Sequence, residues 1–445
     1  MLTFNNELET ARRSILNWSD KSILKNVTIV RDVFGRLSFL LDSSVYPDQN
    51  QRELLNILLK NSLKGYYSEK IYWENISGKK KKYLQPVLDL LKKERKEWLT
   101  DQGILFYLSE RPVAKKAWVY CPPDCDAVWP YEETLCGNKP RVVTFYSFKG
   151  GMGRTTALAG VALQLARKGK NVVMIDTDIE APGLATLFFD EESIRNGVLD
   201  YLLERPLSPG TDITNYILDV TEPCLLKETD GKLYILPAGS VDGNYLQKLA
   251  RIDYQDNREG ALRKAMCDML DEICNRYSAD YILIDSRAGF HDMGGIAVTQ
   301  LPHGVVLFGN DSRQSWDGIT QVIRTISESH EDHIPILLAD CMCDDSTAAT
   351  FLHAKEHFIQ KAYAVCMENY YAEDEELPGK EAANVAHSPV FLPFDLSLKQ
   401  EIILYSTGST VDDERVNAFA KHLAAEAYKT MTGRIESWFG EGDMV

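Results

Sequence analysis

The sequence contains no long hydrophobic run, which argues against a membrane-spanning protein. No window approaches the roughly 18 consecutive apolar residues that a transmembrane helix needs. The N-terminal stretch MLTFNNELETARRS also lacks the basic start and apolar core of a secretory signal. We therefore expect a cytoplasmic protein.

The sequence also lacks a regular cysteine pattern and an excess of positive charge. The nine cysteines follow no repeated spacing along 445 residues, and this favours reduced thiols over a disulfide framework. The net charge of -16 argues against broad binding to nucleic acid, which depends on surface cations. Residues 1–140 nevertheless carry 22 Lys and Arg against 18 Asp and Glu, whereas the remainder carries 27 against 47. Nucleic acid therefore stays open as a partner, and only for the N-terminal part.

A turn-rich stretch divides the chain into two predicted domains. Residues 121–140 read CPPDCDAVWPYEETLCGNKP, and we place a linker at 126–140. The preceding residues, 1–125, predict a small α+β module of unknown function. Its predicted elements are a hairpin formed by 26–32 and 36–42 and helices within 51–65 and 82–99, the second including Trp98.

From residue 141 to residue 445 the pattern alternates between strands and helices. Short apolar runs that can be buried on both faces predict parallel strands, and helical stretches such as 155–168 and 263–277 separate them. This order predicts a doubly wound α/β fold with a mostly parallel sheet, whose ligands gather at the carboxyl ends of the strands. The predicted strands are RVVTFYS (141–147), NVVMIDT (171–177), KLYILPA (232–238), DYILIDS (280–286), GVVLFGN (304–310), IPILLAD (334–340) and SPVFLPF (388–394).

A glycine-rich loop follows the first of these strands and reads FKGGMGRTT over residues 148–156. Glycines let backbone N–H groups converge on an anion, and the start of a helix favours negative charge at the same point. The loop therefore predicts a phosphate site, with Thr155 placed to ligate Mg²⁺. An ordinary glycine turn is the simpler alternative. The residues expected to bind the nucleotide here are Gly150, Gly151, Met152, Gly153, Arg154, Thr155 and Thr156.

Aspartates end two further predicted strands. Asp176 and Asp178 close the segment VVMIDTD, and Asp285 closes DYILID. Buried carboxylates are costly unless they face a cation or a ligand, and Mg²⁺ prefers oxygen ligands. We expect Asp176 and Asp285 in the nucleotide site, and Thr155, Asp178 and Asp285 around Mg²⁺. Each aspartate taken alone could instead cap a helix or a turn.

Together, KGGMGRTT, IDTDIEAPGL and LIDSRAG resemble the motifs of the deviant Walker-A ATPases, the group that includes the ParA and MinD proteins. The resemblance covers about residues 141–445 and implies a P-loop NTPase domain that binds ATP and Mg²⁺. It also implies a homodimer with nucleotide sandwiched between the subunits, in which Lys149 reaches the phosphates bound by the other subunit. Asp178 would orient the attacking water, and Asp285 would hold Mg²⁺ through water.

Two positions depart from that family. Arg154 stands where the family mostly has a second lysine; it keeps the charge but is bulkier, so we expect nucleotide binding to survive and leave the hydrolysis rate open. Arg287 stands in DSRAG, where the family often has proline. Arg287 either senses the γ-phosphate or is a surface arginine, and the sequence does not decide between the two.

The function implied by the resemblance is an ATPase switch of low turnover, with Lys149, Asp178 and Arg154 as the catalytic residues. It would regulate a protein partner or its own N-terminal module. Related switch domains occur in bacterial conflict systems, which points to antiviral defence. Two alternatives stay open: a scaffold that holds nucleotide without hydrolysis, and a phosphotransferase like the bacterial tyrosine kinases. Those kinases usually carry a tyrosine-rich tail, whereas this chain ends with only Tyr405 and Tyr428 in its last stretch.

Weaker signals have simpler explanations. The basic runs 79–82 and 92–96 are typical of a solvated helix face. The C-terminal segment 431–445 resembles the lipid-binding tail of MinD, but it ends acidic, so we expect Ile435, Trp438 and Phe439 to pack and expect no membrane partner. Asp340 and residues 392–395 lie where the family contacts adenine, yet they do not separate ATP from GTP. Candidate metal ligands without a recognised spacing are His330, His333, Cys341, Cys343, His353 and His357, and separately Cys121, Cys125 and Cys136.

Overall fold

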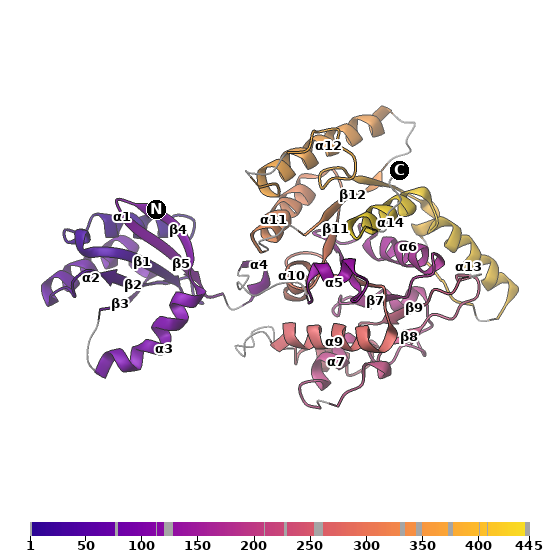
Figure 1. The fold of residues 1–445 in the computed structure, drawn as a ribbon, viewed down its shortest axis with the longest axis horizontal. Coiled ribbons are helices and arrows are strands. Elements are labelled where there is room, and N and C mark those ends of the chain that lie inside the picture. The colour runs from indigo at the N-terminus through magenta and orange to yellow at the C-terminus, as the bar shows by residue number, and fades with distance from the viewer. Residues whose placement is uncertain are drawn as a thin grey trace. The chain divides into compact units, whose positions relative to one another are not determined.

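The computed structural model describes residues 2–75, 79–112, 114–119, 128–208, 210–226, 229–252, 261–329, 334–343, 349–372, 377–399, 401–406 and 408–440. The chain divides into two compact units, Met1–Ala114 and Lys115–Val445, and Figure 1 shows the elements of each. This division falls before the linker that the sequence predicted at 126–140. Trp129 is buried in the core of the second unit, and its indole N–H donates to the carbonyl of Pro140 at 2.9 Å.

The first unit is a five-stranded mixed sheet with helices on both faces. The strands lie in the order β3-β2-β1-β5-β4. β1 and β2 form the predicted antiparallel hairpin, whereas β5 runs parallel to β1 and β3 runs parallel to β2. The elements are α1 (Glu7–Leu16), β1 (Leu24–Arg31), β2 (Leu37–Ser43), α2 (Gln49–Leu63), β3 (Tyr67–Trp73), α3 (Lys79–Glu94), β4 (Lys96–Asp101) and β5 (Ile104–Glu110).

Alternation along the strands explains the layers of this unit. Val27 and Ile29 of β1 face the core that α1 and α2 cover, whereas Val30 faces α3. The helix predicted to run as far as Trp98 ends earlier, because α3 stops at Glu94. Trp98 lies instead in β4, which pairs antiparallel with β5. Pairing with a neighbouring strand has overridden the local helical pattern.

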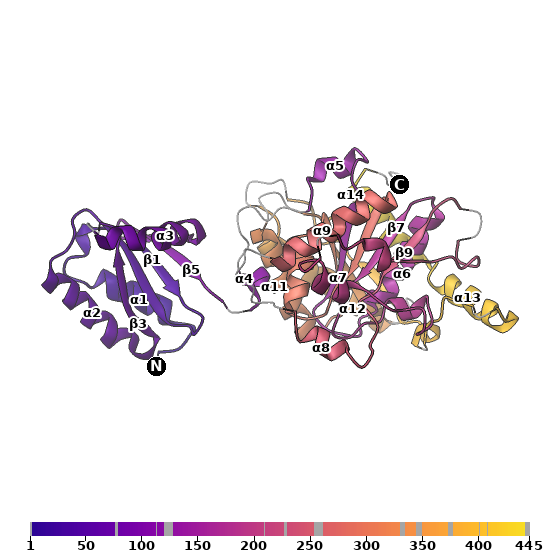
Figure 2. The ribbon, with the colours of Figure 1, turned by 90° about the horizontal axis from the view of Figure 1, so that it is seen from below.

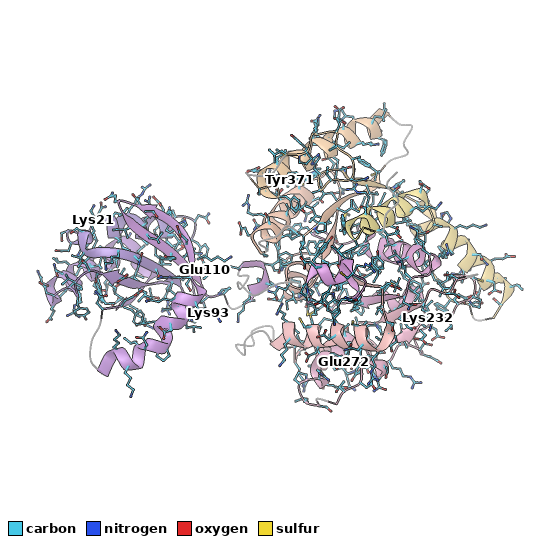
Figure 3. The ribbon with its side chains drawn as sticks, in the orientation of Figure 1. Lys21, Lys93, Glu110, Lys232, Glu272 and Tyr371 are labelled. Carbon is cyan, nitrogen blue, oxygen red and sulfur yellow. The ribbon has the colours of Figure 1, made fainter. Side chains whose placement is uncertain are left out.

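A buried cluster of three charged residues holds the first unit together. The guanidinium of Arg31 binds Glu7, which is fully buried, and lies 2.8 Å from Oε1 of Glu110, labelled in Figure 3. The ring of Phe4 covers the same guanidinium at 4.1 Å. One cation therefore neutralises two carboxylates contributed by different elements.

The second unit is an eight-stranded sheet with helices on both faces, seen from a second direction in Figure 2. Its strand order is β13-β12-β11-β6-β10-β7-β9-β8, and every neighbouring pair is parallel except β8 with β9. The doubly wound prediction is thus confirmed. The strands are β6 (Arg141–Ser147), β7 (Val172–Asp176), β8 (Leu218–Asp219), β9 (Leu233–Leu236), β10 (Tyr281–Asp285), β11 (Gly304–Gly309), β12 (Ile336–Cys343) and β13 (Val390–Pro393).

All seven predicted strands of this unit are present, and the two-residue β8 was missed. The helices are α4 (Lys116–Val119), α5 (Tyr131–Leu135), α6 (Arg154–Arg167), α7 (Val198–Glu204), α8 (Tyr245–Leu249), α9 (Ala261–Tyr277), α10 (Asp292–Thr299), α11 (Arg313–Ser329), α12 (Ala349–Asn369), α13 (Thr410–His422) and α14 (Glu426–Trp438). Short 3-10 helices are η1 (Lys21–Ile23) and η2 (Lys64–Tyr66) in the first unit, and η3 (Ala185–Leu187), η4 (Ile213–Asn215) and η5 (Leu396–Lys399) in the second.

Two cores sandwich the sheet. Val143 and Phe145 of β6 face α6, α13 and α14, whereas Val142 faces the opposite core with α7, α9 and α10. On that opposite side, α11 and α12 cover β11 and β12. β6 lies between β10 and β11, so its carboxyl end opens at the centre of the sheet, where the doubly wound fold binds its ligands.

The C-terminal segment packs inside the second unit, as expected. Ile435 and Phe439 are buried in its core, and the ring of Trp438 lies so close to Gly304 that a Cβ there would stand 2.6 Å from it. In the part of the chain that the structure describes, no helix combines the length and apolar character needed to span a membrane.

The start of the second unit is fastened to α10. The backbone N–H of Lys115 donates to the carboxylate of Asp292, and its ammonium lies 2.9 Å from the second oxygen. The indole N–H of Trp118 donates to the carbonyl of His291 at 2.7 Å. A Cβ at Gly295 would stand 2.9 Å from Trp118, so this glycine is what allows the close approach.

Candidate functional site

The predicted phosphate loop joins β6 to α6, and open space lies beside its three glycines. Gly151 and Gly153 both have φ of +76°, a left-handed conformation that favours glycine. A Cβ at either position, or at Gly150, would meet no atom within 4 Å. Among the described residues, the N–H groups of these three glycines have no hydrogen-bond acceptor. Met152 is buried in the core beneath them and fixes the turn to the domain.

Arg154 and Thr155, the first residues of α6, converge on Asp285 at the end of β10. Nε of Arg154 donates to one carboxylate oxygen, and the hydroxyl of Thr155 donates to the other at 2.6 Å. Only 10% of the Arg154 side chain is exposed. The loop and the carboxyl end of β10 therefore form one site, although their residues lie 131 positions apart in the chain.

Asp178 joins the site from the loop that follows β7. Its Oδ2 lies 3.5 Å from Nη2 of Arg154. Burial raises the pKa of the Asp178 carboxyl above its ordinary value, while the guanidinium groups of Arg154 and Arg287 oppose that rise. Oxygen atoms of Thr155, Asp178 and Asp285 thus lie together beside the guanidinium of Arg154, and such a set of oxygen ligands fits the chemistry of a Mg²⁺ site.

Asp176 has a different environment from the other two aspartates. Its Oδ1 accepts the N–H of Asp178 at 3.0 Å, and its Oδ2 accepts the N–H groups of Gly183 at 3.1 Å and Leu184 at 3.0 Å. Burial, reinforced by the charge of Asp285, raises the pKa of Asp176 to about 7. In the structure Asp176 therefore shapes the 178–184 loop that presents Asp178.

Arg287 lies beside Asp178 rather than on the open surface. Its Nη1 stands 3.9 Å from Oδ1 of Asp178 and 2.5 Å from Oε2 of Glu180. The other oxygen of Glu180 lies 2.6 Å from Nε2 of His291. Sequence reasoning singled out Arg287 but missed Glu180 and His291, because nothing local in IEAPGL or GFHD indicates that they meet.

Lys149 and Thr156 complete the predicted set. Lys149 is exposed, and within the described residues its ammonium has no ion-pair partner. Thr156 is half-buried on α6. Phe148, which sequence reasoning overlooked, anchors the loop from its other side. Its ring packs on Gly318 of α11, where a Cβ would stand only 2.0 Å from the ring.

The weaker predictions fare differently. His357 pairs with Asp311 at 2.6 Å and His353 is exposed, while Cys341 and Cys343 are buried. His330, His333, Cys121 and Cys125 lie outside the described residues. Over the described ranges, the one cluster with metal-ligand geometry comprises Glu222, Cys224 and Asp413, and it includes none of the five predicted ligands that are described there, Cys136, Cys341, Cys343, His353 and His357.

Some residues of the basic runs 79–82 and 92–96 form contacts inside the first unit. Lys92 lies 2.6 Å from Glu74, and the guanidinium of Arg95 stacks on Tyr107 at 3.8 Å. The side chains of Lys81 and Lys82 are exposed.

Asp340, which the sequence placed near the base of the nucleotide, is buried in β12 beside β13. Burial raises the pKa of its carboxyl to about 7.

Comparison with known proteins matches the region that carries this site. A family model described as an AAA domain matches residues 140–337. MinD of Buchnera aphidicola is 29% identical over 199 residues, which cover 44% of this chain and 64% of that protein. A putative MinD of Oltmannsiellopsis viridis is 32% identical over 175 residues, covering 39% and 46% of the two chains. An uncharacterised ATP-binding protein of Methanocaldococcus jannaschii is 29% identical over 153 residues, covering 34% and 46%.

Residues 140–337 are thus similar to P-loop ATPases of the ParA/MinD type. The predicted likeness to ParA and MinD is thereby confirmed, while the deviant loop motif stays a prediction. The chain spans about half the length of the curated relatives it matches, 46% for the first two and 64% for the third.

Solved structures resemble the ParA/MinD-like domain only distantly. MinD of Pyrococcus horikoshii complexed with Mg-ADP is 17% identical, covering 69% of this chain and 100% of that chain with a TM-score of 0.41. pNOB8 ParA bound to nonspecific DNA is 18% identical, covering 67% and 99% with a TM-score of 0.44. At these values the likeness adds nothing to the assignment.

Proposed function

We propose that this protein is an ATP-binding switch that hydrolyses ATP slowly and dimerises around the nucleotide. One observation carries the proposal: Arg154, Thr155, Asp178 and Asp285 converge beside a glycine loop with unpaired N–H groups. Carboxylates and a hydroxyl gathered around the arginine of a glycine loop are the arrangement expected of a site for phosphate and magnesium.

The loop and its first helical residues would bind the phosphates of ATP. The N–H groups of Gly150, Gly151 and Gly153 supply neutral donors, and Arg154 supplies charge that can fork onto two oxygens. Thr155 and Asp285 would hold Mg²⁺, which when bound neutralises charge on the phosphate oxygens. Arg154 would have to leave Asp285 for the phosphates, so nucleotide and magnesium would replace the internal ion pair together.

Hydrolysis would depend on Asp178 and Lys149. Asp178 would orient the attacking water, while Lys149 would reach the nucleotide of a second copy. The exposed position of Lys149 supports this role, because a side chain buried in its own subunit could not cross to another. A lysine supplied only by a partner would make turnover conditional on assembly, which is the behaviour of a switch.

The switch would regulate a protein partner or the first unit of the same chain. pNOB8 ParA was solved with nonspecific DNA, whereas the net charge of -16 argues against broad DNA binding here. A role in antiviral defence stays a prediction of the resemblance. A kinase that phosphorylates its own tail is less well supported, since Tyr428 packs against Gly160 of α6.

The experiment measures ATP and ADP binding by calorimetry, phosphate release, and molecular mass by light scattering, each with and without Mg²⁺. Lys149→Ala is expected to keep ATP binding while losing ATP-dependent dimerisation and phosphate release. Lys232→Ala, which removes an exposed lysine labelled in Figure 3, is the matched control. Dimerisation of Lys149→Ala at the parent level would refute the trans role. ATP binding without phosphate release would favour the scaffold instead.

A further inference from the structure

Two carboxylates on one loop share a guanidinium that comes from a neighbouring strand. Asp178 and Glu180 follow β7, and Arg287 follows β10, the next strand in the sheet. Nη1 of Arg287 lies 3.9 Å from Asp178 and 2.5 Å from Glu180. Only 28% of the Arg287 side chain is exposed, so the charges are screened less than on an open surface.

Glu180 is held in turn by His291. Nδ1 of His291 accepts the N–H of Met293 at 3.3 Å and caps α10, which leaves the proton on Nε2. Nε2 then donates to Glu180 at 2.6 Å. Burial lowers the pKa of His291, which agrees with this neutral tautomer. Glu180 is therefore held by His291, which is itself fixed at the N-terminus of α10.

The charge balance around Asp178 changes when a nucleotide is bound. Before binding, Asp178 faces two guanidinium groups, those of Arg154 and Arg287. Under the proposed function, on which this inference rests, Arg154 moves to the phosphates. Among the described residues, Arg287 is then the cation left in contact with Asp178.

We propose that Arg287 is a positioning residue that holds Asp178 in place during hydrolysis and is itself held by Glu180 and His291. Without Arg287, Asp178 would keep only the N–H of Ala181, which its Oδ1 accepts at 3.3 Å, and small errors in the position of a reacting group are costly. Arg287 lies in the segment DSRAG, where the resembling family often has a proline-containing segment after the aspartate. The pairing of Arg287 with Glu180 joins the segments IEAPGL and DSRAG of this chain.

The test separates catalysis from binding in the full-length protein. For Arg287→Ala we expect kcat to fall about ten- to a hundredfold, with the affinities for ATP and ADP nearly unchanged. Arg287→Lys keeps the charge and should recover part of the rate, whereas Glu180→Gln should lower kcat less than Arg287→Ala. Arg276→Ala on α9, which removes a largely exposed arginine, is the control.

Binding and stability provide readouts besides activity. Thermal melting without nucleotide checks that each variant folds, and Arg287→Met, which keeps the length of the side chain, replaces Arg287→Ala if the latter does not fold. An unchanged kcat would refute the positioning role, as would an Arg287→Lys rate no higher than that of Arg287→Ala. A selective loss of ATP affinity over ADP would instead make Arg287 a phosphate ligand and overturn the inference. A parent protein that binds no ATP would overturn the proposed function, and this role of Arg287 would fall with it.

Discussion

The guanidinium of Arg154 is paired with the carboxylate of Asp285, so the cation of the phosphate loop is bound by the acidic residue that ends β10. Asp178 contacts the same guanidinium at 3.5 Å. In the site proposed for phosphates and magnesium, the cation and the carboxylates are thus paired with one another. Any ligand has to displace this internal pair.

Replacing Arg154 should therefore change the response to magnesium alone. Arg154→Ala leaves Asp285 without its cation and Asp178 with Arg287 alone, and breaking such a buried pair typically costs about 3–5 kcal/mol. We expect a lower melting temperature without nucleotide and a larger rise on addition of Mg²⁺ than in the parent. Differential scanning calorimetry with and without Mg²⁺ checks this. Arg154→Lys keeps the charge and serves as the control; equal responses of parent and Arg154→Ala to Mg²⁺ would contradict the prediction.

The contact between Phe148 and Gly318 should control the loop that carries Lys149. A Cβ at Gly318 would stand 2.0 Å from the ring, so Gly318→Ala has to displace Phe148. We expect a loss of stability of about 1–3 kcal/mol from overpacking and weaker binding of ATP. Gly433→Ala on α14 is the matched control, since a Cβ there meets no atom within 4 Å. If both variants bind ATP equally well, the packing of Phe148 does not support the loop.

His303 should make the second unit less stable in acid. Its Nδ1 accepts the N–H of Val142 at 3.1 Å and its Nε2 donates to the carbonyl of Trp129 at 2.9 Å. Burial lowers the pKa of His303 from 6.5 to about 4. The folded state therefore binds fewer protons than the unfolded state between these values, so this stabilisation is complete above pH 6.5 and is lost as the pH falls toward 4.

The measurement compares urea unfolding of the parent and His303→Gln across that pH window. The difference between them should change by up to about 3 kcal/mol, because the glutamine does not titrate. Unfolding of the parent alone does not isolate the effect of His303. The pKa of Asp176 is raised to about 7, so Asp176 makes the folded state more stable as the pH falls, which opposes the effect of His303. A difference that is constant with pH would show that His303 does not contribute.

Arg31 should determine the stability of the first unit without affecting the nucleotide site. Arg31→Ala leaves Glu7 and Glu110 buried without their shared cation, at a cost of about 3–5 kcal/mol. We expect limited proteolysis to cleave the first unit faster, while calorimetry finds ATP affinity unchanged. Arg36→Ala, whose side chain is 48% exposed, is the control. Equal cleavage of the two variants would show that the buried cluster is dispensable.

Features encoded by neighbouring residues could be predicted from the sequence. The seven long strands are continuous apolar runs, and the glycine loop follows the first of them, so local pattern located both. Trp98 shows the limit of such patterns: it fits a helical spacing, but pairing with β5 placed it in a strand. Within the predicted linker, the burial of Trp129 likewise depends on residues far along the chain, which the local pattern does not indicate.

The chemistry of the candidate site was only partly predictable. The sequence indicated that Arg154, Asp178 and Asp285 belong to one site, because parallel strands end at the same edge of a sheet. It did not indicate that Arg154 binds Asp285 directly, or that Glu180 and His291 meet across 111 positions. Ion pairs are decided by three-dimensional distances and by burial, and neither is encoded in spacing along the chain.

The attachment of Lys115 and Trp118 to α10 gives the loop after β10 two neighbours at once. Arg287 of that loop faces Asp178, while four residues later His291 accepts a hydrogen bond from Trp118. Only four peptide units separate Arg287 from His291. If Arg287 moved by a few tenths of an ångström, either the backbone between them or the hydrogen bond to Trp118 would have to change. The segment that opens the second unit at Lys115 is therefore linked to the candidate site through the loop after β10.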